Sequence, residues 1–210
     1  TTDELTPTTT PKETTVVPKD GIAIDEANFP DPYFRQYVRD TFDFQYGTEG
    51  YLSPLEISNA KGIYVSDTKI KDLTGIEHFS KLNSLNCNKT AISKLDISNN
   101  PELTQLHCSV TAITELDVSN NPKLHTLECC HLSLYQIDVS NNTELVNLYI
   151  SDTLIEELDV SNNVKLSKLD CQKTNLKRLD ISNNTNLTKL ECGRTELESL
   201  DINNNSMLSE

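Results

Sequence analysis

The chain has 210 residues, which is long enough for one sizeable domain or two small ones. It contains 32 Asp and Glu against 18 Lys and Arg, for a net charge of −14. This anionic character argues against nucleic acid or an anionic lipid surface as a partner, because both reward positive charge. No apolar run approaches the ~20 residues that cross a bilayer, so we expect no membrane insertion.

Residues 1–20 are rich in Thr and Pro and have hardly any large apolar side chains. This composition predicts a flexible linker or stalk. The chain does not begin with Met and shows no signal-peptide pattern. We therefore expect either that a leader has been removed or that the chain is an excised segment.

Residues 21–59 predict a small helical unit that caps the N-terminal end of the repeats described below. Asp31 stands where a helix N-cap is expected, and Pro32 follows at the first helical position. Further on, Ser53 and Glu56 have the spacing of a capping box. A solenoid needs such a cover, because the apolar interior of its first coil has no preceding coil to pack against.

Between these two helices, the stretch "QYGTEGYLSPLE" resembles an EF-hand loop, with Gly50 at the sixth position and Glu56 at the twelfth. Calcium loops carry carboxylate ligands at the first and third positions, where this chain has Gln45 and Gly47. We therefore expect a degenerate loop that binds no calcium.

Residues 60–210 are organised by a repeat of 21 residues. Blocks of the form LxxLxCxxTxIxxLD(I/V)SNNPx begin at Leu82, Leu103, Leu124, Leu145, Leu166 and Leu187. A more degenerate coil precedes them from Ala60, and Leu208 opens another that is truncated at the C-terminus. A period of this length with leucines at fixed offsets predicts a leucine-rich repeat solenoid of about seven coils.

One coil predicts a short strand followed by an extended or 3-10 return segment. Leu85 and Cys87 are two residues apart, so they point to the same, inward side of a strand. Ile92, Leu95 and Ile97 fill the interior as the chain turns back, and "SNNP" has turn chemistry. The fold class is therefore an α/β repeat with a parallel sheet on the concave face, its strands about 4.8 Å apart.

The cysteines of the repeat share one inward slot, in which Ile150 replaces Cys in its coil. The slot is filled by Cys87, Cys108, Cys129, Cys171 and Cys192. Exchange with Ile favours a buried ladder of reduced thiols. Disulfides and a metal site are the alternatives, but neighbouring strands are ~4.8 Å apart whereas a disulfide brings its Cβ atoms to about 3.8 Å.

Two polar ladders accompany the cysteines. A threonine three residues after the cysteine slot is expected to bond a neighbouring backbone group and replace the asparagine usual in such repeats. The aspartates of the "LD" pairs (Asp96, Asp117, Asp138, Asp159, Asp180 and Asp201) are expected to cap local turns by accepting backbone N–H bonds. A cation held between the stacked carboxylates is the alternative.

The outward side chains of the strands vary most in the middle coils, where His107, Glu128 and Tyr149 occupy one slot on three successive coils. Cys130 and His131 lie beside them, and we expect Cys130, unlike the ladder cysteines, to be exposed. These five residues are named the central patch. Tyr is enriched among interface hot spots, so the central patch is a candidate protein-binding site. The alternatives are a mixed, solvated surface and a zinc site formed by His107, Glu128 and Cys130.

The 21-residue period with an inward cysteine and the ending "LDVSNNPKL" resemble the cysteine-containing repeats of the internalin J type, and more broadly bacterial surface leucine-rich repeat proteins. The segment "IKDLTGIEHFSKL" is similar to an ordinary internalin repeat. The resemblance covers Ala60 to Glu210 and implies a secreted or wall-attached bacterial protein that binds other macromolecules. This chain departs from the family in having Thr where such repeats usually have Asn.

These observations predict an extracellular, monomeric binding module for a protein of a host or a neighbouring cell, without a cofactor. A carbohydrate or cell-wall binder is an alternative that needs aromatic platforms on the concave face, and among the expected outward residues only Tyr149 qualifies. A structural spacer would show a featureless concave surface. An enzyme is not expected, because no nucleophile–base pair, metal pair or phosphate loop stands out.

Overall fold

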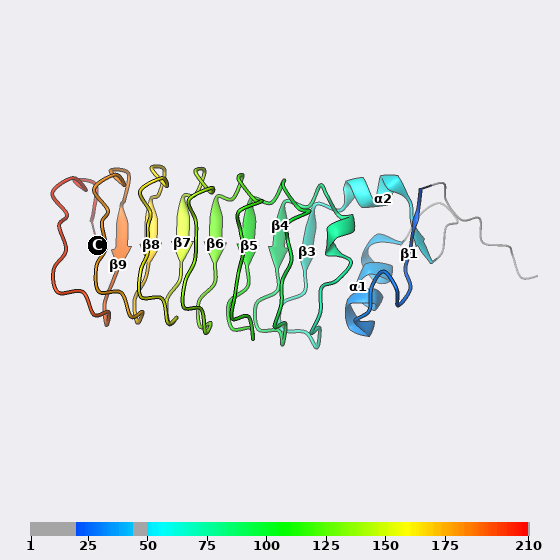
Figure 1. The fold of residues 1–210 in the computed structure, drawn as a ribbon. Coiled ribbons are helices and arrows are strands. Elements are labelled where there is room, and N and C mark those ends of the chain that lie inside the picture. Colours follow the sequence, from blue (N-terminus) through cyan, green and yellow to red (C-terminus); the bar gives the residue numbers. More distant parts are fainter. Residues whose placement is uncertain (1–19, 44–49, 210) are drawn as a thin grey trace, which may run out of the picture.

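Seven short parallel strands form one sheet in the computed structural model, which describes residues 20–43 and 50–209 (Figure 1). Their order in the sheet is their order in the chain. The strands are β3 (Gly62–Tyr64), β4 (Ser84–Asn86), β5 (Gln105–His107), β6 (Thr126–Glu128), β7 (Asn147–Tyr149), β8 (Lys168–Asp170) and β9 (Lys189–Glu191). The fold is thus the predicted leucine-rich repeat solenoid, with one strand from each coil.

Two predictions fall wholly or partly outside the described residues. Of the predicted flexible linker over residues 1–20, the structure describes residue 20 alone. The part of the EF-hand-like loop from Gln45 to Glu49 is also outside. Both therefore stay predictions.

The register of the sheet repeats at every step. Leu85 of β4 lies opposite Leu106 of β5, and Leu106 lies opposite Leu127 of β6. These central leucines are fully buried, so the middle residue of each strand points into the solenoid and its two neighbours point out. We call the outward side of the sheet the strand face.

The return segments contain little regular structure. The 3-10 helix η1 (Ile76–His78) lies in the first coil, and the return segments of the later coils are extended backbone and turns. Just after each strand, one residue takes a left-handed conformation, with φ between 55° and 59°. These residues are Asp67, Lys89, Val110, His131, Asp152, Lys173 and Arg194. The chain therefore leaves every strand through the same turn.

A ladder of buried asparagines connects the coils on the return side. The last Asn of each "SNN" sequence, and of "NNN" in the last coil, donates two hydrogen bonds of 2.9 or 3.0 Å from Nδ2 to carbonyl oxygens of the preceding coil. Asn142, for example, binds the carbonyls of Val118 and Asn121. The members are Asn100, Asn121, Asn142, Asn163, Asn184 and Asn205. We call them the asparagine ladder.

The asparagine ladder corrects the role expected for the threonines. Each threonine hydroxyl donates to the carbonyl three residues earlier in its own coil, as Thr90 does to Cys87 at 2.7 Å. The other bonds come from Thr111, Thr153, Thr174 and Thr195. The threonines bond backbone as predicted, but they close a local turn, and the asparagines carry the bonds between coils.

The aspartates act as the predicted turn caps. Asp138 Oδ1 accepts the backbone N–H of Ser140 at 2.9 Å, and the other five aspartates make the same bond. The serine hydroxyl and then the serine N–H lower the pKa of Asp138 below its ordinary value. Each carboxylate is therefore occupied by its own turn, which leaves the cation alternative without support.

Two helices and a two-stranded sheet pack at the N-terminal end of the solenoid (Figure 1). They are α1 (Pro32–Phe42), α2 (Pro54–Asn59), β1 (Ile22–Ala23) and β2 (Tyr51–Leu52). The predicted N-terminal caps of both helices are confirmed. The Asp31 side chain accepts from the N–H groups of Tyr33 and Phe34, and Ser53 and Glu56 form a capping box.

Aromatic and polar contacts join this unit to the first coil. Phe29 and Phe42 pack against Phe79, with ring centroids 6.3 and 5.3 Å apart. Asp31 Oδ2 accepts the backbone N–H of Lys71, so one carboxylate caps α1 and binds the first coil as well. The apolar interior of that coil is thereby covered.

The last described coil is less buried than the others. Leu190 and Cys192 are half-buried, whereas Leu169 and Cys171 in the preceding coil are almost fully buried. The prediction that Cys192 is buried is therefore wrong. The inward slot excludes solvent when coils pack on both sides, and among the described residues Cys192 has a complete coil on one side alone.

We expect Asn142→Ala to destabilise the protein by roughly 1–3 kcal/mol, because it removes two buried hydrogen bonds to the preceding coil. Asn141→Ala is the matched control: Asn141 is exposed, so its loss should change stability by less than about 0.5 kcal/mol. Urea unfolding followed by circular dichroism measures both variants. Equal stabilities would show that the asparagine ladder does not hold the coils together.

Candidate functional site

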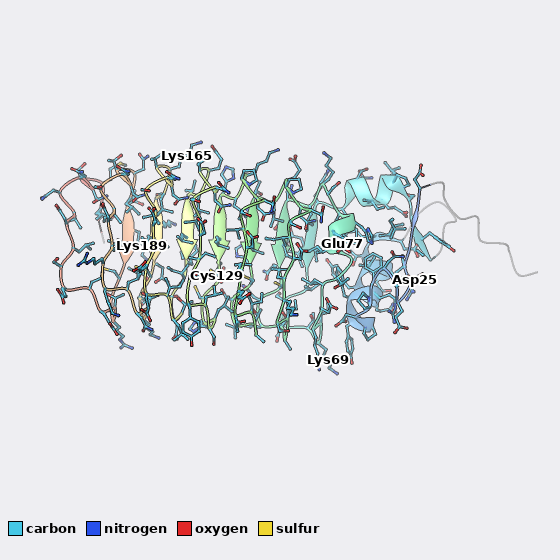
Figure 2. All side chains as sticks on the ribbon, viewed as in Figure 1. Asp25, Lys69, Glu77, Cys129, Lys165 and Lys189 are labelled. Atoms are coloured by element: carbon cyan, nitrogen blue, oxygen red, sulfur yellow. The ribbon has the colours of Figure 1, made fainter. Side chains whose placement is uncertain are left out.

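The strand face carries one continuous row of side chains from the last residue of each strand. The register places them in the order Tyr64, Asn86, His107, Glu128, Tyr149, Asp170 and Glu191. The predicted alignment of His107, Glu128 and Tyr149 on three neighbouring strands is confirmed. Figure 2 shows side chains along the whole solenoid, with Cys129 labelled near its middle and Lys189 near its C-terminal end.

Glu128 is the centre of a hydrogen-bond network on this row. Its Oε2 lies 2.7 Å from His107 Nδ1, and its Oε1 accepts from the Ser109 hydroxyl at 3.1 Å and from Asn88 Nδ2 at 3.4 Å. The Glu128 and His107 side chains are 32% and 25% exposed, so the pair is reachable from solvent yet held on several sides. Three neighbouring coils thus fix one carboxylate.

The network extends to Cys130 through backbone groups. Ser109 Oγ accepts the N–H of Cys130 at 2.9 Å, while the Ser109 N–H donates to Asn88 Oδ1 at 2.6 Å. Cys130 was expected to be exposed, but it is half-buried. Burial raises the pKa of its thiol, and hydrogen bonds with Ser151 offset part of that rise.

His131 does not point along the row with the other members of the central patch. It occupies the left-handed turn after β6, and its Nδ1 lies 2.9 Å from Asp152 Oδ2. Lys173 Nζ is 3.8 Å from the same carboxylate oxygen. His131 therefore belongs to an exposed polar cluster with Asp152 and Lys173, in the turns that follow the strands.

Tyr149 borders a small depression of about 100 Å³ on the strand face. The depression is also lined by Lys168, Leu169, Asp170, Lys189 and Glu191. Lys189 Nζ forms an ion pair with Glu191 Oε1, at 2.6 Å. Partial burial, and then the charge of Glu128, raise the pKa of the Tyr149 phenol, so this side chain is a neutral hydrogen-bonding group at neutral pH.

The zinc alternative gains no support from the geometry. Within residues 20–43 and 50–209, no group of three or more His, Cys, Asp or Glu side chains is placed to hold a metal ion. His107 is instead engaged with Glu128, and Cys130 with serines.

The inward cysteines form a ladder of free, buried thiols, as predicted for four of the five. These are Cys87, Cys108, Cys129 and Cys171. Burial raises the pKa of Cys87 and of Cys171 to about 12, and it also raises the pKa of Cys108 and of Cys129 well above the ordinary thiol value. Such thiols are protonated at neutral pH and therefore poor nucleophiles.

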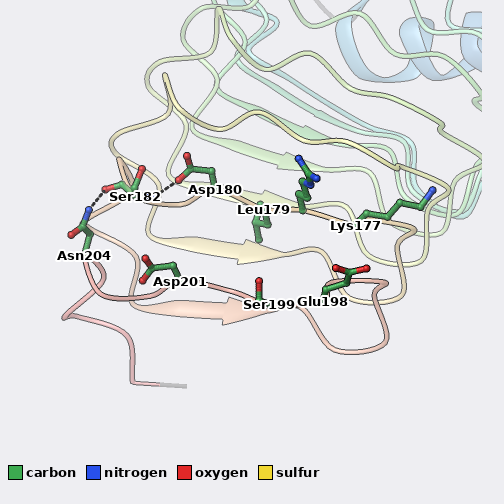
Figure 3. A pocket seen from close by; sticks show the side chains of 9 residues that line it. Lys177, Leu179, Asp180, Ser182, Glu198, Ser199, Asp201 and Asn204 are labelled. Carbon is green, nitrogen blue, oxygen red and sulfur yellow. Dashed lines mark hydrogen bonds between the residues drawn. The ribbon is translucent and has the colours of Figure 1, made fainter.

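A larger groove lies elsewhere, between the return segments of the last two coils (Figure 3). It has a volume of about 830 Å³, and Lys177, Asp180, Ser182, Glu198 and Asp201 are among its lining residues. Asp180 and Asp201 cap their own turns, and Asn204 donates to the Ser182 carbonyl at 3.3 Å. These three polar side chains hold the turns of the repeat, so we place the candidate site on the strand face.

No helix in the described part of the chain is long and apolar enough to cross a membrane.

Comparison with known families assigns the chain. The family model described as the leucine-rich repeat domain of the endo-β-N-acetylglucosaminidase EndoS matches residues 29–209. The chain belongs to this family. The match spans the helical cap and the repeats. A search of curated proteins found no significant match.

Solved structures add internalins to the similar proteins. The functional domain of InlJ from Listeria monocytogenes, described as including a cysteine ladder, is 27% identical, with a TM-score of 0.56 over 93% of this chain and 52% of that one. The chain thus spans about half the length of that domain. The predicted resemblance to internalin repeats is confirmed.

Two further structures share the fold at lower identity. Internalin C2 of Listeria monocytogenes is 17% identical, with a TM-score of 0.67 over 90% of this chain and 95% of that one. A leucine-rich repeat protein of Leptospira interrogans is 21% identical, with a TM-score of 0.69 over 74% of this chain and 44% of that one.

Two residues of the strand face were not predicted from the sequence: Ser109, which belongs to the Glu128 network, and Tyr64, which begins the row. Ser109 stands two residues after His107, at the position that Cys130 takes in the next coil, so the repeat register could have pointed to it. Tyr64 lies in the degenerate first coil, which is one residue longer than the others and obscures the alignment.

Iodoacetamide should label native protein at Cys130 and Cys192 and spare the four buried cysteines until unfolding. Labelling should be slow at pH 8 and speed up as the pH rises past 9, because burial raises the pKa of both half-buried thiols and the thiolate is the reactive form. Peptide mass spectrometry identifies the sites. Rapid modification of Cys129 in native protein would contradict the buried ladder.

Proposed function

We propose that the chain is an extracellular bacterial binding module that contacts a protein partner through the central patch on the strand face. The Glu128 network carries this proposal. Three coils converge on one half-exposed carboxylate, and a half-exposed tyrosine lies next to it on β7. A spacer has no need of such a network on its outer surface.

The network favours binding because it is rigid before a partner arrives. Its side chains stand on strands that pair along the whole sheet, so little conformational entropy is lost when a partner docks. Tyr149 offers apolar area with a polar tip, which suits the centre of a protein interface. Glu128 and His107 offer a hydrogen-bonding pair beside it.

Membership of a leucine-rich repeat family and the likeness to internalins support a binding role over a catalytic one. The family takes its name from an enzyme, but its model describes the repeat domain of that enzyme. The four ladder thiols of this chain are buried and protonated, which makes them poor nucleophiles. A monomer on or outside the cell surface, facing a host or neighbouring cell, is the setting that fits this proposal.

We expect Tyr149→Ala to weaken partner binding by about 1–2 kcal/mol, or roughly 5–30-fold, without loss of folding. The matched control is Tyr135→Ala, the same change at a tyrosine that is 65% exposed on a return segment. Lys189 is a poor control, because it lines the same depression as Tyr149.

The assay captures surface proteins from host cells and from neighbouring bacteria on immobilised wild-type protein and on both variants. Quantitative mass spectrometry should find a protein retained by wild type and Tyr135→Ala and depleted on Tyr149→Ala. Equal depletion by both variants, or equal recovery from Tyr149→Ala and wild type, would refute a role for the central patch. Circular dichroism confirms that each variant is folded.

A further inference from the structure

A second feature of the strand face lies at its N-terminal end, where Tyr64 of β3 is 62% exposed. A Cβ atom added to Gly62 would lie 2.5–2.7 Å from Cε2, Cζ and the hydroxyl oxygen of Tyr64. The phenol ring therefore folds back along its own strand and lies over Gly62, in space that any other residue would fill. One edge of the ring lies against the sheet at Gly62, and the residue as a whole remains largely exposed.

The surroundings hold this ring in place. The Tyr64 N–H donates to the hydroxyl of Tyr37 in α1 at 3.0 Å, which anchors the backbone at the edge of the sheet. Ser84, the neighbour of Gly62 on β4, is 7% exposed, whereas the equivalent Gln105 on β5 is exposed. Burial of Ser84 fits a ring that covers this corner of the sheet.

The neighbouring outward residues are polar and uncharged. Asn86 adjoins Tyr64 on β4, and its Oδ1 accepts the N–H of Asn88, which fixes the amide group. Gln105 lies one strand further, about two strand spacings or ~10 Å from β3. At the other end of the sheet the outward residues of β8 and β9 are charged, so the N-terminal end has a different chemistry.

We propose that Tyr64, Asn86 and Gln105 form a subsite for a neutral pyranose residue of a glycan. The C–H groups on one side of a pyranose ring carry partial positive charge and pack on the negative face of an aromatic ring. The hydroxyls at the rim of the sugar pair with side-chain amides, which both donate and accept. A nucleobase could also stack on the ring, but the net charge of −14 disfavours the phosphate groups of a nucleic acid.

This subsite goes beyond the proposed protein contact and stands on different residues. It also revises an expectation: a carbohydrate binder was expected to need aromatic platforms, for which Tyr149 alone qualified. Tyr64 supplies a more exposed platform on the same row.

The test begins with a glycan array of neutral and sialylated oligosaccharides probed with the wild-type protein. The strongest neutral glycan is then titrated by isothermal calorimetry into wild type and variants. Tyr64→Ala should weaken binding at least about 10-fold, whereas Tyr64→Phe should stay within about 3-fold, because stacking needs the ring and not the hydroxyl. Gly62→Ala should weaken binding as well, since its Cβ displaces the ring.

Tyr135→Ala is the control for loss of an exposed tyrosine elsewhere, and Tyr149→Ala separates this proposal from the protein contact. Both should bind the glycan like wild type. Thermal melting of each variant checks that it is folded. The proposal is overturned if no neutral glycan binds, if Tyr64→Ala binds as well as wild type, or if Tyr64→Phe loses as much affinity as Tyr64→Ala.

Discussion

The pair of hydrogen bonds donated by each buried asparagine is the constraint on which the rest of the structure depends. An isolated coil of 21 residues cannot bury its own apolar side chains, so it needs a neighbour at a fixed position. Each ladder asparagine reaches two carbonyls of the preceding coil at 2.9 or 3.0 Å. Because the same bonds recur at each step, the strands stack in constant register.

These asparagines are specified by their NH2 group. Their Oδ1 atoms are buried without a hydrogen-bond partner among the described residues, a cost that the two donated bonds must offset. Each carbonyl that they bind also accepts a backbone N–H of its own turn, so the asparagine adds a second donor that ties this turn to the next coil. Neither Asp nor Leu can supply two N–H groups at this position, which explains why the residue is repeated in all six coils.

Constant register separates the interior from the strand face. Inside, one small slot per coil accepts Cys or Ile, and the thiols in it are protonated and unreactive where coils pack on both sides. Outside, the side chains lie beyond the apolar interior and vary from strand to strand. The row therefore combines a tyrosine platform at Tyr64, a carboxylate network at Glu128 and charged residues on β8 and β9 within one rigid frame.

Much of this arrangement could be predicted from the sequence. The period fixes which residues face inward, and local rules identified Asp31, Ser53 and Glu56 as caps, because those contacts join residues close in the chain. The asparagine ladder was missed because "SNN" also has turn chemistry and its main contacts reach the previous coil. A repeat alignment does not show that Cys192 is half-buried, because its burial depends on whether a complete coil packs on each side. Nor does it show the Tyr64 platform, which depends on the space left by Gly62 beside the ring.

Hydrogen exchange of asparagine side-chain amides, followed by NMR in native protein, tests the central role of the ladder most directly. If the ladder holds the coils in register, the Nδ2 hydrogens of Asn121, Asn142 and Asn163 exchange only when the solenoid opens, together with the backbone amides of β5 to β8. Within the described residues, the exposed Asn120 and Asn141 make no side-chain hydrogen bond to the preceding coil, so they exchange rapidly and serve as the internal reference. Exchange of the ladder amides as fast as that of the exposed ones, with the strand amides still protected, would contradict the account.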